Sequence, residues 1–435
     1  LGDKLTVLIS TPISHCLCCG SSALHEYLDL GMQPPPNAIH DNINRPKLHP
    51  LRVNVCTECW HSQLTHAVDQ DTLFTNYPYR TGVSETLSKY YYQFARDVIM
   101  SMGSLPVSER NVLDIGCNDG TLLKSFKEFG WNTAGIDPCP TAEHVPGVDL
   151  YIKGYWNAEL IEKENLGYAF SLITGTNVFA HVSNPLKFLV NCKDVLTRDG
   201  TVILEFPYQL KVIQDGQFDT IYFEHISYFT VSSLRYLVNE ADMYIDDIFA
   251  TNVHGGSLRV FLKNRDRNQM NNSKVAELIK LEDNYNLRTL DKYIGYSQKV
   301  YNVRKILNAM IEDMRSAGYK MVGFGASGKG SVLINYCEID LEYIIDQTPG
   351  KIGKYSPGRN IPIVPLNQLA EEESLLCILI LVWNCLSECI NKINYMRKGK
   401  MSTSAGLLPN RLKDGPSGLT DKCLVHVPTP TFFNI

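Results

Sequence analysis

The stretch Val112-Leu-Asp-Ile-Gly-Cys-Asn-Asp-Gly-Thr-Leu-Leu123, followed by Ala134-Gly-Ile-Asp137, decides the fold of this 435-residue chain. A hydrophobic strand runs into a glycine turn and the start of a helix, and a second strand ends in an acid. The pattern predicts a βαβ unit that holds an adenosine-containing ligand. Glycine lets the backbone approach such a ligand, and the acid accepts hydrogen bonds from ribose hydroxyls.

The spacing inside the turn indicates which ligand is bound. A dinucleotide turn reads G-x-G-x-x-G and directs a helix N-terminus at a pyrophosphate. Here the pattern is D-x-G-x-x-x-G, and Asp119 lies inside the turn. An acid there would repel phosphates but suits a cationic sulfonium, so we predict S-adenosylmethionine, with a plain αβ turn as the alternative. The predicted cofactor-binding residues are Asp114, Gly116, Gly120 and Asp137.

Length and composition describe a globular protein with more than one domain. A chain of 435 residues exceeds one ordinary core, and 44% hydrophobic with 20% charged residues is typical of folded proteins. The net charge of −5 gives no sign of nucleic-acid binding. No signal-peptide pattern precedes the first domain, and the longest apolar run, Leu375–Trp383, is too short to span a bilayer. We therefore expect a cytoplasmic monomer that binds neither nucleic acid nor membrane.

Two C-x-x-C pairs lie near the start of the sequence, Cys16-Leu-Cys-Cys19 and Cys56-Thr-Glu-Cys59. Each pair can present two thiolates from one tight turn, and four thiolates complete the tetrahedral shell of zinc. We predict a structural zinc ion held by Cys16, Cys19, Cys56 and Cys59, because a closed shell leaves no position for chemistry. Cys18 could replace a neighbour as ligand. A redox pair and unligated cysteines are the alternatives.

Strand and helix patterns alternate through the middle of the chain. Helices are expected over Glu85–Met102 and Pro185–Leu196, and strands over Ser171–Thr174 and Gly200–Glu205. This alternation predicts a mostly parallel, doubly wound sheet whose ligands bind beyond the carboxyl ends of the strands. The loop Gly175-Thr-Asn-Val-Phe-Ala-His181 would lie at that edge, as would the segment after the second strand.

That segment, Phe218-Asp-Thr-Ile-Tyr222-Phe-Glu224-His225-Ile-Ser-Tyr228-Phe, crowds ionisable and phenolic groups among aromatics that would exclude water. A histidine beside a carboxylate is the usual way to set a general base near neutral pH, and tyrosine can donate to a developing oxyanion. A strand edge with a salt-bridged histidine is the alternative. Farther along, His254-Gly-Gly-Ser-Leu-Arg259 predicts contact with an anionic ligand or a simple hairpin turn.

A second glycine-rich turn follows in Tyr319-Lys-Met-Val-Gly-Phe-Gly-Ala-Ser-Gly-Lys329-Gly. It matches G-x-G-x-x-G after a strand, and Asp346 ends the next expected strand. Gly330 replaces the Ser or Thr of a P-loop ATPase, which argues against that class. NAD binding, a phosphate-facing turn for another nucleotide, and a structural turn stay open. A basic loop that contains Lys351 suits a diphosphate.

Taken in order, these motifs resemble the nucleotide-sugar C-methyltransferase family, whose members act on nucleotide-linked keto-deoxy sugars. The resemblance runs from Cys16 to about Ile393. It is carried by both cysteine pairs and by the motifs Gly31-Met-Gln-Pro34, Asn37, Tyr77-Pro-Tyr79, Asp114-Ile-Gly116, Tyr222 to Phe229, His254 to Arg259, Gly323-Phe-Gly325-Ala and Pro357-Gly358.

The resemblance implies an α/β architecture. A small amino-terminal zinc-binding domain, a central doubly wound Rossmann-like S-adenosylmethionine methyltransferase domain and a carboxy-terminal Rossmann-like α/β domain are expected at 1–75, 76–266 and 319–435. A connector at 267–318 would consist of helices over Val275–Leu287 and Ile294–Met314. The tail at 397–435 is atypical, with no clear closing strand before Cys423–Val427.

The resemblance also implies the roles of site residues. His225 would be the general base, with Tyr222 and Glu224 beside it, although Phe223 fills a place that is usually histidine. Tyr77 and Tyr79 would line the same cleft. Apart from the resemblance, the loops and glycine-rich turns described above assign contacts with the substrate to His181, His254, Arg259, Lys329 and Lys351.

The expected reaction is transfer of a methyl group to a carbon next to a ketone, through an enolate, for branched-sugar biosynthesis. The alternatives are an S-adenosylmethionine-dependent O- or N-methyltransferase of a small molecule, an NAD-dependent nucleotide-sugar enzyme, and a zinc-stabilised scaffold without catalysis.

Overall fold

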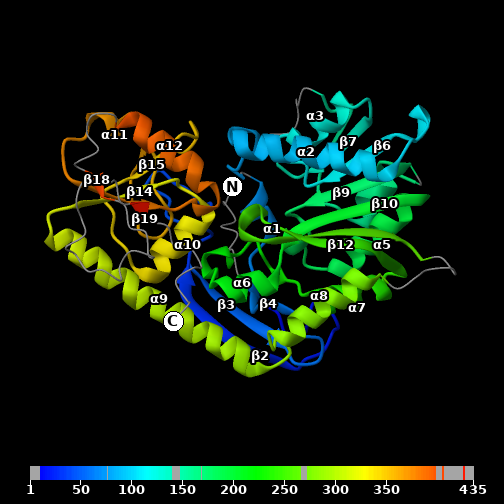
Figure 1. Cartoon of the computed structure of the whole chain (residues 1–435), viewed down its shortest axis with the longest axis horizontal. Helices are drawn as coiled ribbons and strands as arrows, with labels where there is room; N and C mark the ends of the chain where they lie inside the picture. Colours follow the sequence, from blue (N-terminus) through cyan, green and yellow to red (C-terminus); the bar gives the residue numbers. More distant parts are fainter. Residues whose placement is uncertain are drawn as a thin grey trace, which may run out of the picture.

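The structure, a computed structural model, describes residues 10–75, 77–139, 147–167, 169–265, 272–397, 404–405 and 425–426. Two α/β lobes lie side by side in Figure 1, and the amino-terminal strands lie below and between them. The mixed α/β class, with its amino-terminal cysteine cluster, confirms the predicted fold. The limits of the predicted domains stay a prediction.

The amino-terminal sheet is antiparallel, in the order β11-β4-β3-β2. It consists of β2 (Leu24–Gln33), β3 (His49–Cys56), β4 (Ser62–Leu64) and β11 (Ser227–Tyr228). The strand β11 comes from the chemically rich segment in the middle of the chain, so two distant parts of the sequence share this sheet. Nearby, β1 (Thr11–Pro12) pairs with β5 (His66–Ala67), and α1 (Gln70–Phe74) follows.

The central sheet has the order β12-β13-β10-β9-β6-β7-β8. All neighbouring strands are parallel except at β13, which runs antiparallel to β10 and β12. Its strands are β6 (Asn111–Ile115), β7 (Asn132–Asp137), β8 (Leu150–Lys153), β9 (Phe170–Thr176), β10 (Leu196–Pro207), β12 (Met243–Thr251) and β13 (Ser257–Asn264). In β6, four of five residues are buried, as expected for a strand with helices on both faces. The predicted, mostly parallel sheet is confirmed.

Helices pack against this sheet and lead the chain from one strand to the next. They are α2 (Glu85–Met102), α3 (Thr121–Glu128), α4 (Ala158–Lys163), α5 (Pro185–Val195), α6 (Gln209–Asp215) and α7 (Val231–Glu240). Ser84 caps α2 by accepting a hydrogen bond from the Leu87 amide. From there α2 buries Tyr91, Phe94 and Val98 against the apolar side of α3 and the sheet.

Two connector helices lead to the second lobe. α8 (Ser273–Asn284) and α9 (Leu290–Ser316) agree with the helices expected in this region. The long α9 runs along the edge of the molecule in Figure 1 and contacts β2, where Tyr293 packs on Tyr27 with 4.9 Å between ring centroids. The connector therefore also fixes the amino-terminal sheet.

The second lobe has a parallel sheet in the order β16-β15-β14-β17-β18, with β19 also paired to β17. Its elements are β14 (Lys320–Phe324), α10 (Gly328–Cys337), β15 (Ile344–Asp346), β16 (Ile363–Pro365), α11 (Gln368–Glu371), β17 (Leu376–Ile380), α12 (Leu386–Met396), β18 (Ser404–Ala405) and β19 (Val425–His426). Beyond Arg397, only these last two strands are described, so most of the atypical tail lies outside the described residues.

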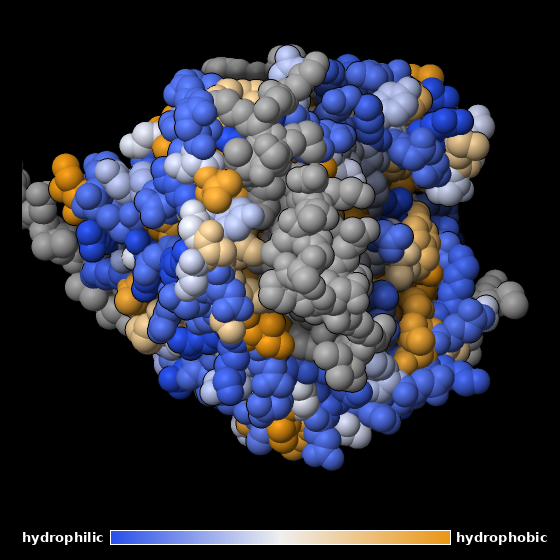
Figure 2. Space-filling view, turned by 60° about the vertical axis from the view of Figure 1, so that its left-hand side comes forward, coloured by the Kyte–Doolittle hydropathy of each residue, from blue (hydrophilic) through white to orange (hydrophobic). Residues whose placement is uncertain are grey.

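The outer surface is typical of a globular protein. On the face shown in Figure 2, hydrophilic residues predominate and apolar residues form small groups. Among the described helices, none combines the length and apolar composition that a bilayer crossing requires.

Candidate active site and metal centre

The four predicted cysteine ligands meet in the amino-terminal region. The Sγ atoms of Cys16, Cys19, Cys56 and Cys59 all lie within 4.8 Å of one another. Four soft sulfur donors in this arrangement fit zinc, and they leave no open position for a substrate. Cys18 is not part of the cluster, because its thiol donates to the carbonyl of Ser233 (3.3 Å). The structure thus resolves which cysteine of the first pair is the second ligand.

A cavity of about 1010 Å³ lies where the carboxyl ends of the two parallel sheets face each other. Its walls come from the amino-terminal region, the central sheet and the carboxy-terminal lobe. The predicted site residues that line it are Tyr77, Tyr79, Asp114, Gly116, Asp137, His181, Tyr222, His225, His254, Lys329 and Lys351. Gly120, Glu224 and Arg259 are not among the lining residues.

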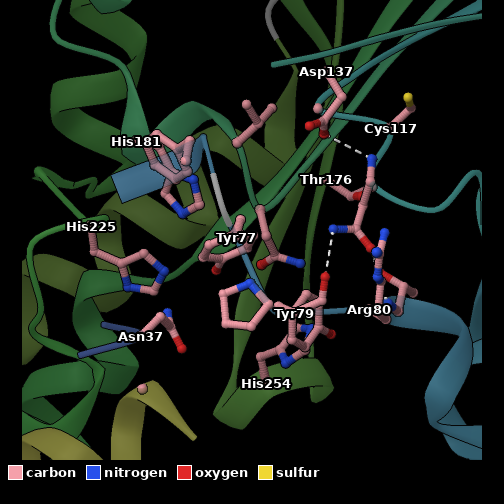
Figure 3. A pocket seen from close by; sticks show the side chains of 18 of the residues that line it. Asn37, Tyr77, Tyr79, Arg80, Cys117, Asp137, Thr176, His181, His225 and His254 are labelled. Carbon is pink, nitrogen blue, oxygen red and sulfur yellow. Dashed lines mark hydrogen bonds between the residues drawn. The ribbon is translucent and has the colours of Figure 1, made fainter. Parts of the chain in front are cut away.

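The glycine turn after β6 forms one end of this cavity. Gly116 has φ +73°, and a Cβ there would come within 3.1 Å of the Val178 side chain, so the turn requires glycine. Asp137, at the end of β7, accepts hydrogen bonds from the amides of Asn118 (2.9 Å) and Cys139 (2.8 Å). Its carboxylate lines the cavity, as Figure 3 shows, and can accept further bonds from ribose hydroxyls. These features fit an adenosine-containing cofactor.

The other two cofactor candidates lie deeper. Asp114 accepts a hydrogen bond from the Thr174 hydroxyl (2.7 Å), and burial raises the pKa of its carboxyl to about 7. Gly120 has φ +70° and precedes α3 without lining the cavity. It shapes the turn and makes no cavity wall.

Asp119 has a different role from the one expected. Its Oδ2 accepts a hydrogen bond from the Gly82 amide (2.7 Å), and its Oδ1 accepts from the Thr121 hydroxyl (2.6 Å). It does not line the cavity. The interpretation that this acid faces a sulfonium is therefore wrong. Asp119 instead holds the segment Tyr77–Ser84 against the glycine turn.

His225 is held from both sides of its ring. Nδ1 lies 2.8 Å from the Thr220 carbonyl, and Nε2 lies 2.8 Å from the Tyr222 hydroxyl. A carbonyl can only accept, so Nδ1 carries the proton and Nε2 receives the Tyr222 hydroxyl. Burial and the nearby His181 lower the pKa of His225 well below its ordinary value. The imidazole is neutral and offers its basic nitrogen toward Tyr222.

Glu224 does not act as the carboxylate partner of His225. Its Oε1 accepts a hydrogen bond from the side-chain amide of Asn37 (2.7 Å), and its Oε2 has no hydrogen-bond partner. Burial raises its pKa to about 7. Glu224 therefore ties the segment to the amino-terminal region through its bond with Asn37. Asn37 lines the cavity, whereas Glu224 does not. The expectation that it sets the base is not supported by this geometry.

Aromatic side chains surround His225. The ring of His181 stacks at 5.2 Å from it, and burial lowers the pKa of His181 to about 4. His181 Nε2 is buried without a hydrogen-bond partner. Tyr77 and Tyr79 follow, with ring centroids 6.2 Å apart. Figure 3 shows Tyr77 between the two histidines and Tyr79, while Asp137 lies at the opposite end of the cavity.

Arg259 was predicted to contact the substrate, and the structure contradicts this prediction. Its Nε lies 2.9 Å from Glu205 Oε2, its Nη2 donates to the Tyr90 hydroxyl (2.6 Å), and its guanidinium lies over the Phe94 ring. The guanidinium charge of Arg259 is therefore paired inside the central domain, and the side chain does not line the cavity. The neighbouring glycines serve packing, because a Cβ at Gly255 would overlap the Trp383 ring.

The two predicted lysines line the cavity from the second lobe. Lys329 Nζ donates to the carbonyl of His254 (3.0 Å) and lies 4.3 Å from the Trp383 ring. Lys351 Nζ donates to the carbonyl of Ala326 (2.8 Å). The carboxylate of Asp346 accepts hydrogen bonds from the amides of Ala326 and Thr348 (both 2.8 Å). Asp346 thus stabilises the glycine turn.

Sequence reasoning missed two polar residues of the cavity wall. Asn118, inside the first glycine turn, accepts from the Thr81 amide (3.1 Å) and donates to the Tyr79 carbonyl (3.0 Å). Glu388 of α12 accepts from the Ser84 hydroxyl (3.3 Å) across the cavity mouth. The place of Asn118 in the turn could have indicated it, whereas Glu388 has no local signal.

Three family models match the chain in succession. Residues 16–74 match "Putative zinc binding domain", residues 87–247 match "Methyltransferase domain", and residues 252–403 match "C-methyltransferase C-terminal domain". C-methyltransferase NovU of Streptomyces niveus is 28% identical over 402 residues, which cover 90% of this chain and 95% of that protein. The chain is thus similar to C-methyltransferases along most of its length. It is an S-adenosylmethionine-dependent methyltransferase and carries a zinc-binding cluster of four cysteines.

Other relatives match a shorter part of the chain. A ubiquinone biosynthesis O-methyltransferase of Shewanella pealeana is 29% identical over 161 residues, which cover 32% of this chain and 65% of that protein. Among solved structures, magnesium protoporphyrin IX methyltransferase of Synechocystis PCC 6803 with bound SAH is 13% identical. That match has a TM-score of 0.32 and covers 41% of this chain and 83% of the other.

Proposed function

We propose that this protein is a C-methyltransferase that methylates a carbon next to a ketone in a nucleotide-linked deoxy sugar, through an enolate. The observation that carries the proposal is the buried, neutral imidazole of His225 beside the cavity of the glycine turn. Attack by carbon requires removal of a proton from carbon, and a neutral imidazole in a dry site is suited to that task. Attack by oxygen or nitrogen needs no enolate.

In this proposal Tyr222 and His225 work as a pair. The proton leaves the substrate carbon for the Tyr222 oxygen while the hydroxyl proton of Tyr222 passes to Nε2 of His225. The resulting imidazolium is stabilised by its Nδ1–H bond to the Thr220 carbonyl, which strengthens as the ring gains charge. When bound, S-adenosylmethionine supplies an electrophilic methyl group and accepts the electron pair of the broken C–S bond.

Tyr77 and His181 are the proposed partners of the enolate oxygen. Burial raises the pKa of Tyr77 well above its ordinary value, so its hydroxyl keeps a proton to donate. The buried Nε2 of His181 has no hydrogen-bond partner among the residues that the structure describes, which supports a partner from the ligand. Both side chains line the cavity next to His225, so one bound molecule can reach all three.

A nucleotide diphosphate is the proposed anionic part of the substrate. Lys329 and Lys351 line the cavity; each donates to a backbone carbonyl, and Lys351 Nζ also lies 3.7 Å from Asp346 Oδ2. The first residues of α10 line the same wall, where a helix N-terminus favours negative charge. These groups support a substrate whose sugar faces His225 and whose diphosphate faces the second lobe.

The test is His225→Ala, incubated with a panel of nucleotide keto-sugars and S-adenosylmethionine. Mass spectrometry should show one added methyl group with the parent protein and at least a hundredfold slower transfer with the variant. Calorimetry should give the same affinity for S-adenosylmethionine in both, because the histidine lies at the other end of the cavity. His25→Ala, on the exposed side of β2, is the matched control. Equal loss of cofactor binding and transfer would make His225 a structural residue.

A second measurement separates carbon from oxygen or nitrogen transfer. With S-adenosylhomocysteine in deuterated water, the parent protein should place deuterium at the acceptor carbon, because enolisation is reversible without a methyl donor. No incorporation by a protein that still transfers methyl groups would favour an O- or N-methyltransferase.

A further inference from the structure

The edge strand of the zinc-binding sheet belongs to the candidate catalytic segment. β11 begins two residues after His225 and pairs with β4, with Gln63 opposite Ser227 and Ser62 opposite Tyr228. The Leu64 amide also donates to the carbonyl of Ile226 (3.0 Å). The exit of the His225 turn is therefore fixed by backbone bonds to a strand that starts three residues after Cys59.

Gln63 joins this strand pair to the other cysteine knuckle. Its Oε1 accepts from the Leu17 amide (2.7 Å), and its Nε2 donates to the His15 carbonyl (2.9 Å). These two backbone groups lie on either side of Cys16. Gln63 is completely buried, so both hydrogen bonds are protected from water. One side chain thus connects the backbone that presents a cysteine ligand with the strand opposite β11.

A second contact holds the same pair of strands. His61, the second residue after Cys59, places Nε2 3.3 Å from the Ser227 hydroxyl and its ring 4.8 Å from that of Phe229. Both Ser227 and His61 are buried. The metal-binding knuckles therefore contact β11 through Gln63 and through His61.

We propose that Gln63 is a positioning residue, which ties the β4–β11 pair to the metal-binding knuckle and so holds His225 at the cavity. The proposal rests on the role proposed above for His225. Displacing a reacting group by about 1 Å can cost about a hundredfold in rate. Loss of the Gln63 bonds should therefore lower kcat while the zinc and the cofactor stay bound.

The test is Gln63→Met, which keeps the length of the side chain and removes both hydrogen bonds. We expect one zinc per chain by elemental analysis and an unchanged affinity for S-adenosylmethionine. We expect kcat to fall about ten- to a hundredfold. Hydrogen-exchange mass spectrometry should show faster exchange in peptides that cover residues 221–229. Thr57→Val is the matched control: it removes the bond to the Ala23 carbonyl (3.3 Å) from the second knuckle and does not touch β11.

Unchanged kcat and unchanged exchange at residues 221–229 in Gln63→Met would overturn the proposal, as would equal effects of Thr57→Val. If Gln63→Met loses its zinc, Gln63→Glu decides, because it keeps an acceptor for the Leu17 amide and removes only the donor to the His15 carbonyl. Faster exchange at residues 221–229 in that variant supports the proposal, and unchanged exchange overturns it. Full activity of His225→Ala would refute the proposed base but not the backbone coupling through Gln63. Hydrogen exchange measures that coupling independently of activity.

Discussion

The Thr220 carbonyl determines how His225 can act. It accepts the Nδ1 proton at 2.8 Å, so the basic nitrogen is Nε2, which faces Tyr222. Burial and the neighbouring His181 then lower the pKa of His225, because the charged imidazole would lose its hydration. A neutral base held in one tautomer results, without help from a carboxylate.

This lowered pKa predicts the acid limb of the pH profile. An exposed histidine titrates near pH 6.5. Since the neutral form of His225 persists below that pH, kcat/KM should stay level as the pH falls through about 6.5 and decline only in more acidic solution. Stopped assays of methyl transfer between about pH 5 and pH 8 measure this. An acid limb centred at or above pH 6.5 would contradict the assignment of the base.

The buried carboxyl of Asp114 predicts that the stability of the folded protein changes with pH. Burial raises the pKa of its carboxyl from 3.8 to about 7, so the folded protein binds the proton more tightly than the unfolded chain does. The stability that the protonated carboxyl contributes is fully present below the pKa of the unfolded chain. It is lost as the pH rises through the pKa of the folded protein. Asp114→Asn should therefore gain thermal stability relative to the parent between about pH 4 and pH 7. Differential scanning calorimetry checks this, and a constant difference across the range would contradict it.

Residue chemistry was partly readable from the sequence. The crowding of His225 and Tyr222 in one segment indicated His225 as the candidate base, and the structure places both side chains at the cavity. The partner of the base was not readable, because a backbone carbonyl such as that of Thr220 leaves no sequence signal. Arg259 was misassigned since a charged residue beside two glycines looks the same whether it meets a ligand or the buried Glu205.

At the scale of elements, Tyr77–Ser84 forms a cover over the cofactor end of the cavity. Asn118 and Asp119, in the glycine turn, bind the backbone of this segment at Tyr79, Thr81 and Gly82. The bond from the Gly82 amide to the Asp119 carboxylate is charge-assisted and therefore stronger than a neutral one. These bonds hold the cover against the turn.

Asp119→Ala should weaken this cover. Loss of a charge-assisted bond of about 1.5–3 kcal/mol predicts a rise in the Kd for S-adenosylmethionine of about tenfold or more. Calorimetry measures this Kd. Asp97→Ala, on the exposed side of α2, is the control. An affinity unchanged by Asp119→Ala would show that the cover does not contribute to binding.

At the scale of the whole molecule, the two lobes meet at a small buried junction. Trp383 of the second lobe donates its indole N–H to Asp219 (2.6 Å), and its ring lies against Gly255. Gly255 has φ +96°, which disfavours any other residue. Asp219 precedes Thr220, so the junction adjoins the residue that orients His225.

Gly255→Ala should therefore disturb the relative placement of the lobes. Its Cβ would overlap the Trp383 ring, so the ring must move. We expect KM for the proposed nucleotide-sugar substrate to rise tenfold or more, because the two ends of that substrate would contact different lobes. The Kd for S-adenosylmethionine should stay unchanged. Gly295→Ala in α9 is the control. No atom lies within 4 Å of its Cβ, and helix propensity favours alanine by about 0.5–1 kcal/mol. Equal kinetics in both variants would contradict the expected role of the junction.

The large-scale architecture was the most predictable part. Alternating strands and helices indicated the central sheet, the second glycine-rich turn and the family resemblance indicated the second lobe, and the cysteine spacing indicated the zinc cluster. The joining of β11 to the amino-terminal sheet was not predictable. A two-residue strand among aromatics has no periodicity, and its partner lies more than 160 residues away, at Gln63 and Ser62.

That shared strand bears on any attempt to recombine enzymes of this type. Exchanging the amino-terminal module at a single crossover near residue 75 would leave the donor's β4 facing a foreign β11. A working hybrid needs a second crossover pair that also carries the donor's residues around 226–229. The functional module is thus discontinuous along the gene, although it is contiguous in space.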